Sequence, residues 1–189
     1  GKTYLGNNLL KFFKNSILIN TDSFYRDDII IKLLSILKGD IYDRLISIRK
    51  NDIIKTIDSI YSQKKNIPFY NYDFNKRKSS YYLRQIQNIN TVKLIIIEGI
   101  FAHRLNINYN ISYNIVCEEK KDICLKRRVR RDILERGRTI KNIDQLYNKS
   151  WKLFYDNLAY FITNNKVTTF NSKNKKGFQK IINEIKNFI

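Results

Sequence analysis

Short apolar runs recur along the chain, separated by stretches with the spacing of amphipathic helices. Four of these runs predict β-strands: residues 17–20, 93–97, 113–117 and 167–170. A helical stretch follows each of them, and this alternation is typical of a parallel sheet with helices on both faces. The pattern therefore predicts an α/β fold.

Apolar side chains spaced three and four residues apart predict the helices. The predicted helices cover residues 4–14, 29–37, 52–63, 80–89, 120–136, 143–163 and 176–188. A chain of 189 residues without a Gly/Ser linker has the length of one domain with a sizeable core. We expect a single domain over residues 1–189.

The chain is strongly basic, with 36 Lys and Arg against 17 Asp and Glu and a formal net charge of +19. This charge attracts polyanions, so nucleotide phosphates, nucleic acid and anionic membrane are candidate partners. One His and two cysteines, Cys117 and Cys124, form no zinc pattern, and we interpret the cysteines as buried thiols in a reducing compartment. No apolar run has the length of a membrane span and no secretory signal is visible, so we expect a cytoplasmic protein.

The first three residues have the order of the end of a phosphate-binding loop, which reads Gly, four residues, then Gly-Lys-Ser/Thr before a helix. In that interpretation Gly1 and Lys2 contact nucleotide phosphates, and Thr3 is a ligand of Mg²⁺. The chain holds no Met, and we expect the first strand and the start of the loop to precede Gly1. The alternative is a surface segment without function.

Two of the predicted strands end on a carboxylate. Asp22 follows the run at 17–20, and Glu98 follows the run at 93–97. Ligands of open parallel sheets bind beyond the carboxyl ends of the strands. There, one carboxylate can serve Mg²⁺ directly or through water, while the other acts as a base toward an attacking hydroxyl. The alternatives are a helix N-cap for Asp22 and an ordinary strand end for Glu98.

Residues 126–138, KRRVRRDILERGR, hold seven basic side chains in thirteen positions. Three interpretations remain open: a helix that binds nucleic-acid phosphates, a lid over about 126–139 that closes on a transferring phosphoryl group, and a solvated basic helix. Asp132 and Glu135 lie among the basic residues and argue against a face that binds nucleic acid. We therefore favour the lid.

Five segments in order resemble the uridine kinase family of P-loop kinases, which is close to phosphoribulokinase. They are Gly-Lys-Thr, TDSFYR (21–26), IPFYNYDF (67–74), IIIEGIFA (95–102) and RRDILERGR (130–138). The resemblance implies a P-loop kinase fold with an Arg-rich lid helix. It also implies transfer of the γ-phosphate of ATP or GTP, with Mg²⁺, to the 5′-hydroxyl of uridine or cytidine in nucleotide salvage. A homo-oligomer is implied as well. From the residues themselves we expect no membrane partner and no nucleic-acid partner.

The resemblance also assigns a role to each residue that matches a family motif. Asp22 would be the catalytic base, and Thr3, Glu98 and Asp22 would hold Mg²⁺. The phosphates would be contacted by the loop and by basic side chains, with Lys2, Arg131 and Arg136 taking part in catalysis. The nucleotide-binding set is Gly1, Lys2, Thr3, Arg128 and Arg131.

The acceptor would be held by a second set of residues: Tyr25, Asp43, Tyr72, Arg77 and Arg138. Asp43 would hold the ribose hydroxyls and Arg138 would face the ribose, while Tyr72 would pack against the base. The chain departs from the family in this region. Arg77 stands where the family has a base-contacting His, the Gln-Tyr pair after the lid is Leu146-Tyr147, and the longer IPFYNYDF segment allows Tyr70 or Tyr72 as the stacking ring.

These departures leave the acceptor open. One alternative is a related kinase for another hydroxylated molecule, such as a sugar phosphate or a pantothenate-like compound, and Arg77 would suit an anionic substrate. The other is a catalytically inactive, basic module that binds RNA.

Overall fold

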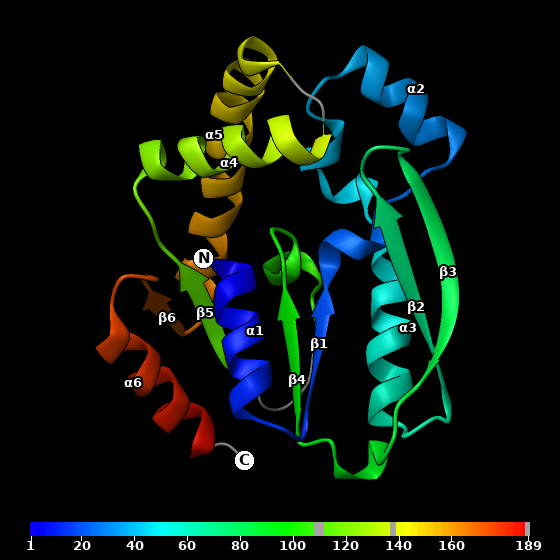
Figure 1. Cartoon of the computed structure of the whole chain (residues 1–189), viewed down its shortest axis with the longest axis vertical. Coiled ribbons are helices and arrows are strands. Elements are labelled where there is room, and N and C mark those ends of the chain that lie inside the picture. The colour runs from blue at the N-terminus through cyan, green and yellow to red at the C-terminus, as the bar shows by residue number, and fades with distance from the viewer. Residues whose placement is uncertain (108–111, 137–138, 188–189) are drawn as a thin grey trace.

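Two pairs of parallel strands form the centre of the molecule (Figure 1). The computed structural model describes residues 1–107, 112–136 and 139–187. Strand β1 (Ser16–Asn20) pairs with β4 (Leu94–Glu98), and β5 (Asn114–Cys117) pairs with β6 (Val167–Phe170). All four predicted strands are therefore confirmed, with ends that differ by one residue at most.

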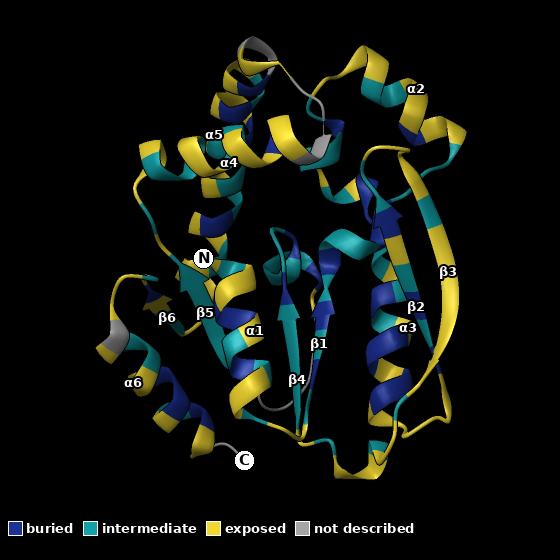
Figure 2. Cartoon of the chain, in the orientation of Figure 1, coloured by how far each residue is buried: buried dark blue, intermediate teal, exposed yellow. Residues whose placement is uncertain are grey.

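Helices cover both sides of β4. Its side chains alternate, with Ile95 and Ile97 in the core cluster that contains α3 (Lys50–Tyr61) and Leu94 and Ile96 in the cluster that contains α1 (Lys2–Phe12) and α6 (Lys175–Lys186). In Figure 2 the buried residues of these helices face the strands. This confirms the predicted α/β fold.

Three further helices lie around this centre: α2 (Ile29–Leu37), α4 (Lys121–Arg136) and α5 (Ile140–Asn164). Helix α4, which carries the basic segment, lies beyond the carboxyl ends of β1, β4 and β5 in Figure 1. Short 3₁₀ turns connect the elements: η1 (Thr21–Phe24), η2 (Ile41–Asp43), η3 (Leu45–Ser47), η4 (Ile89–Thr91) and η5 (Ala102–Arg104). Within the described ranges, no helix is long and apolar enough to cross a membrane.

The predicted helix over 80–89 is wrong, because these residues belong mainly to a strand. Strand β3 (Lys78–Gln85) pairs with β2 (Asn66–Asp73) in an antiparallel hairpin. Aromatic rings meet across the pair: Phe69 stacks on Tyr82 with ring centres 6.0 Å apart, and Tyr70 meets Tyr81 at 5.3 Å. Aromatic cross-strand pairs stabilise a sheet, and here they outweigh the local helical spacing.

Cys117 and Cys124 are free thiols. Both are half-buried rather than buried, which corrects the expectation from their sequence context. Cys117 ends β5, and a side chain on Gly1 would lie 3.6 Å from its Cβ atom. The start of α1 is thereby fixed beside the end of β5.

Candidate active site

The two strand-end carboxylates lie at one edge of the sheet. Strands β1 and β4 are in register, so that Asn20 lies opposite Glu98. Asp22 follows in η1, where its backbone N–H donates to Asn20 Oδ1 at 2.8 Å. The side chain of Asn20 therefore caps this turn, in place of the N-cap role considered for Asp22.

Helix α1 brings the hydroxyl of Thr3 to Glu98. Thr3 Oγ1 lies 3.3 Å from both carboxylate oxygens of Glu98, and its single proton can be donated to either. Burial raises the pKa of Glu98, and the charge of Asp22 raises it further, while Lys2 and the Thr3 hydrogen bond lower it. Lys2, Thr3, Asp22 and Glu98 thus form one cluster, in which the other three residues influence the charge of Glu98.

The cluster has the ligand chemistry that Mg²⁺ prefers. Carboxylate and hydroxyl oxygens are hard ligands, and Mg²⁺ in nucleotide sites binds through one or two carboxylates together with substrate phosphates. The described residues contain no group of three or more His, Cys, Asp or Glu that could hold a metal ion alone. Thr3, Asp22 and Glu98 therefore fit a Mg²⁺ ion that arrives with a nucleotide.

Gly99 allows the two strand ends to approach each other. Its φ of +138° lies in a region that L side chains rarely adopt, and a Cβ atom there would be 1.8 Å from Thr21 Oγ1. Thr21 is fully buried and begins the turn that carries Asp22. The glycine after Glu98 is therefore needed to bring η1 against the end of β4.

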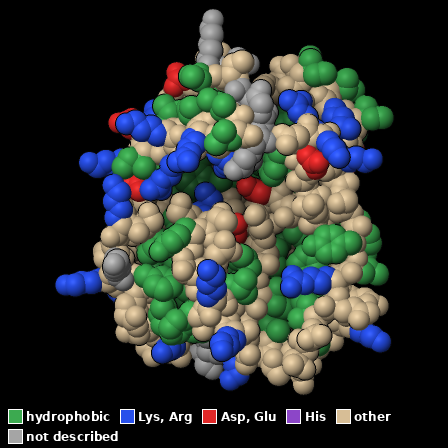
Figure 3. Space-filling view, viewed as in Figure 1, with side chains coloured by type: hydrophobic (Ala, Val, Ile, Leu, Met, Phe, Trp, Pro, Cys, Tyr) green, Lys and Arg blue, Asp and Glu red, His purple; other side chains and the backbone are tan. Residues whose placement is uncertain are grey.

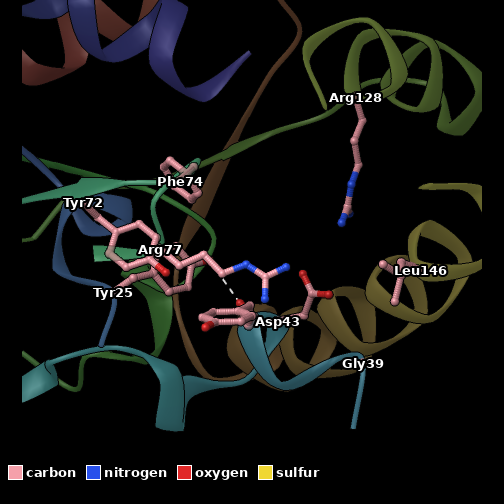
Figure 4. Close-up of a pocket in the computed structure, with 9 residues that line it drawn as sticks. Tyr25, Gly39, Asp43, Tyr72, Phe74, Arg77, Arg128 and Leu146 are labelled. Atoms are coloured by element: carbon pink, nitrogen blue, oxygen red, sulfur yellow. Dashed lines mark hydrogen bonds between the residues drawn. The ribbon is translucent and has the colours of Figure 1, made fainter. Parts of the chain in front are cut away.

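A pocket is lined by residues from β2, η2, α4 and α5 and by Tyr25 (Figure 4). Tyr25 follows η1 directly and forms the centre of an aromatic wall, with ring centres 5.8 Å from Tyr42, 5.3 Å from Tyr72 and 5.7 Å from Phe74. The Tyr25 hydroxyl donates to the carbonyl of Tyr42 at 3.0 Å. On the face shown in Figure 3 the surface is hollowed near its centre, with acidic side chains inside the hollow and Lys and Arg side chains around it.

Of the two tyrosines that the sequence left open, the geometry favours Tyr72 as the ring of the pocket. Tyr72 is buried and lines the pocket, whereas Tyr70 packs on Phe24 with ring centres 5.5 Å apart and is not among the lining residues. Burial raises the pKa of Tyr72, with a contribution from Tyr42, so its phenol is protonated at neutral pH.

Asp43 reaches the pocket from η2 and is held there by α5. Ser150 Oγ lies 2.6 Å from Asp43 Oδ2 and 2.7 Å from the carbonyl of Leu146, and it has one proton to share between them. A side chain on Gly39 would lie 3.4 Å from Leu146, so the segment before η2 also packs on α5. Sequence analysis missed Ser150, because nothing in the sequence links it to a residue 107 positions away.

The arginines of α4 differ in whether they line the pocket. Arg128 lines the pocket, lies over the ring of Tyr147 at 5.7 Å and pairs with Asp132 at 3.6 Å. Arg131 also pairs with the buried Asp132, at 2.9 Å, while its side chain remains partly exposed. Asp132 therefore anchors both arginines. The helix includes Arg136, whose side chain is not described, and Arg138 lies outside the described residues.

Comparison with known proteins identifies the family. A sequence profile of the family described as Phosphoribulokinase / Uridine kinase matches residues 51–172, more than half of the chain. The chain belongs to this family. The parallel strands and flanking helices are consistent with the P-loop kinase fold that the motifs implied.

Individual members of the phosphoribulokinase/uridine kinase family match parts of the chain. A uridine kinase of Schizosaccharomyces pombe is 31% identical over 107 residues, which cover 56% of this chain and 22% of that protein. A uridine kinase of Proteus mirabilis is 34% identical over 85 residues, covering 44% of this chain and 38% of that protein. A chloroplastic uridine/cytidine kinase of Arabidopsis thaliana is 29% identical over 98 residues, covering 51% and 19%. The matched segments therefore span well under half of each relative.

Proposed function

We propose that the protein is a phosphotransferase that moves the γ-phosphate of ATP or GTP to the 5′-hydroxyl of a pyrimidine ribonucleoside, a reaction of nucleotide salvage. The observation that carries the proposal is the position of the carboxylates at the sheet edge. Thr3 Oγ1 lies 3.3 Å from Glu98, Asp22 is close enough to raise the pKa of Glu98, and Tyr25 places an aromatic pocket directly after the Asp22 turn. The similarity to uridine kinases supports the same reaction.

In this proposal Asp22 is the base. It accepts the proton of the acceptor hydroxyl as the oxygen attacks phosphorus, while Lys2, Arg131 and Arg136 neutralise phosphate charge. Thr3, Glu98 and Asp22 would hold Mg²⁺, which supplies further charge neutralisation when it is bound. Phosphoryl transfer depends mainly on positioning and electrostatics, and the cluster provides both.

The pocket would hold the acceptor. Asp43 can accept hydrogen bonds from two ribose hydroxyls, because an ionised carboxylate has two acceptor oxygens. The rings of Tyr25, Tyr72 and Phe74 offer a flat apolar surface to a base. With the ribose at Asp43 and the base against these rings, we expect the 5′-hydroxyl to point to the Asp22 turn.

The experiment is a transfer assay with Mg²⁺, γ-labelled ATP or GTP, and uridine or cytidine, in which the product is identified by mass spectrometry. The proposal predicts a labelled nucleoside 5′-monophosphate. Hydrolysis of ATP without a labelled nucleoside, or label on another molecule only, would refute the assigned acceptor.

A further inference from the structure

Asp27 lies in the short segment that links the η1 turn to α2, and its side chain joins two distant elements. Its Oδ1 accepts from Arg49 Nη2 at 2.7 Å, at the start of α3, and its Oδ2 accepts from the backbone N–H of Ser79 at 3.0 Å, on β3. The neighbouring Asp28 instead caps the start of α2. Two adjacent carboxylates thus have different uses, and that of Asp27 bridges residues 22 and 52 positions away.

The ion pair between Asp27 and Arg49 is partly buried and joins side chains that are already ordered. The side chains of Asp27 and Arg49 are 22% and 26% exposed. The Arg49 guanidinium also lies over the ring of Tyr70 on β2, at 5.2 Å, and the Arg49 backbone N–H donates to the carbonyl of Phe24 in η1 at 2.9 Å. Hydrogen bonds to an ionised group are stronger than neutral ones, and partial burial protects the pair from screening by salt.

The Ser79 contact holds the end of the hairpin that lines the pocket. Ser79 lies directly opposite Tyr72 in the β2–β3 pair. Tyr72 and Arg77 both line the pocket, and Figure 4 shows the Arg77 side chain passing Tyr25 on its way into it. The ring of Tyr25, from the segment after η1, lies 5.3 Å from the ring of Tyr72. The end of the hairpin and the segment after η1 thus meet at the pocket.

Asp27 is absent from the pocket lining, so it can act on a ligand through the elements that it joins. It follows Asp22 by five residues along the chain. We propose that Asp27 is a positioning residue for the nucleoside, because it holds the end of the β2–β3 hairpin, with Tyr72, in a fixed place relative to the turn that carries Asp22. The inference rests on the proposed function, in which Tyr72 faces the base and Asp22 faces the 5′-hydroxyl.

The test measures KM and kcat for uridine, the Kd for ATP, and hydrogen exchange of the Ser79 amide. Asp27→Ala removes both contacts, so the Ser79 amide should exchange about tenfold faster or more. The KM for uridine should rise about 5- to 20-fold, with kcat changed less than about threefold and the Kd for ATP unchanged, because the wall that Asp27 holds is remote from the phosphate. Asp27→Asn keeps the side-chain volume and one acceptor oxygen, and it should raise the KM about two- to fivefold.

Asp28→Asn is the matched control, because it changes the adjacent carboxylate while Asn caps a helix about as well as Asp. It should leave the KM for uridine and the exchange of the Ser79 amide unchanged. An unchanged KM in Asp27→Ala and Asp27→Asn would overturn the inference alone, even if the Ser79 amide exchanges faster, as would an equal rise in KM in Asp28→Asn. Failure of the unaltered protein to phosphorylate either uridine or cytidine would overturn the proposed function and the inference together.

Discussion

Substitution of Gly99 by Ala tests how the end of β4, with Glu98, and the turn that carries Asp22 are brought together. Gly99 has φ of +138° and directly follows Glu98, and a Cβ atom there would lie 1.8 Å from Thr21 Oγ1. Thr21 is fully buried, so it cannot yield by turning into solvent. Gly99→Ala must therefore change the backbone at Gly99, displace the η1 turn, or both.

The expected loss has two parts. A side chain at a backbone conformation that favours Gly costs about 1–3 kcal/mol. Overpacking of a buried site costs about 1–3 kcal/mol more, since the contact has to open by more than an ångström. Together these give about 2–6 kcal/mol, a large share of the roughly 5–15 kcal/mol that stabilises a typical protein. For a chain of this length the melting temperature should fall by about 5–20 °C.

A double-mutant cycle separates the two parts in thermal or denaturant unfolding. Thr21→Ala removes Oγ1, which is buried without a hydrogen-bond partner among the described residues, and leaves the 3.0 Å contact to Thr21 Cβ. In the Thr21→Ala background, Gly99→Ala should cost about 1–3 kcal/mol less than it does alone.

Gly177→Ala is the control for this prediction. Gly177 lies in the first turn of α6, where a Cβ atom would meet Asn174 at an ordinary 3.4 Å. This substitution should leave stability unchanged or raise it by about 0.5–1 kcal/mol. A Gly99→Ala protein that melts within about 2 °C of the unaltered protein, or a cycle without coupling, would refute the steric argument.

Two further predictions concern the carboxylates of Asp43 and Glu98. Ser150→Ala should raise the KM for the nucleoside about three- to tenfold with a smaller change in kcat, because Asp43 loses a 2.6 Å hydrogen bond. Thr163→Ala on the same helix is the control and should change neither constant. A fall in kcat as large as the rise in KM would contradict a positioning role for Ser150. Because burial raises the pKa of Glu98 above 4.5, its ionisation destabilises the folded protein as the pH rises through that raised pKa. Without Mg²⁺, the melting temperature of Glu98→Gln should therefore rise relative to that of the unaltered protein between about pH 4 and pH 8. A difference in melting temperature that stays constant over this range would contradict the raised pKa.

The central strands and the cluster of Lys2, Thr3, Asp22 and Glu98 could be predicted because they follow from local patterns in the sequence. Each strand is a short apolar run; β4 ends on Glu98, and Asp22 lies two residues after the end of β1. Parallel pairing then brings the ends of β1 and β4 to the same edge, as the register of Asn20 opposite Glu98 shows. The proximity of Asp22 and Glu98 therefore follows from the order of residues along the chain.

The β2–β3 hairpin and the pocket around Asp43 could be predicted less well, because they depend on contacts between distant segments. The sequence around Tyr81 and Tyr82 has the spacing of a helix. These residues form a strand because β2 places Tyr70 opposite Tyr81 and Phe69 opposite Tyr82. Ser150 has the ordinary pattern of a helical serine that bonds the carbonyl four residues before it. Its contact with Asp43 arises only when α5 packs against η2.

The role of Asp22 as the base is tested by phosphate transfer to uridine in the Asp22→Asn variant, measured together with ATP binding. If Asp22 is the base, the transfer rate should fall about 10²- to 10⁴-fold while the Kd for ATP changes little. Asp156→Asn, an exposed carboxylate of α5, should leave both unchanged. Transfer by Asp22→Asn at the rate of the unaltered protein would show that Asp22 is not the base.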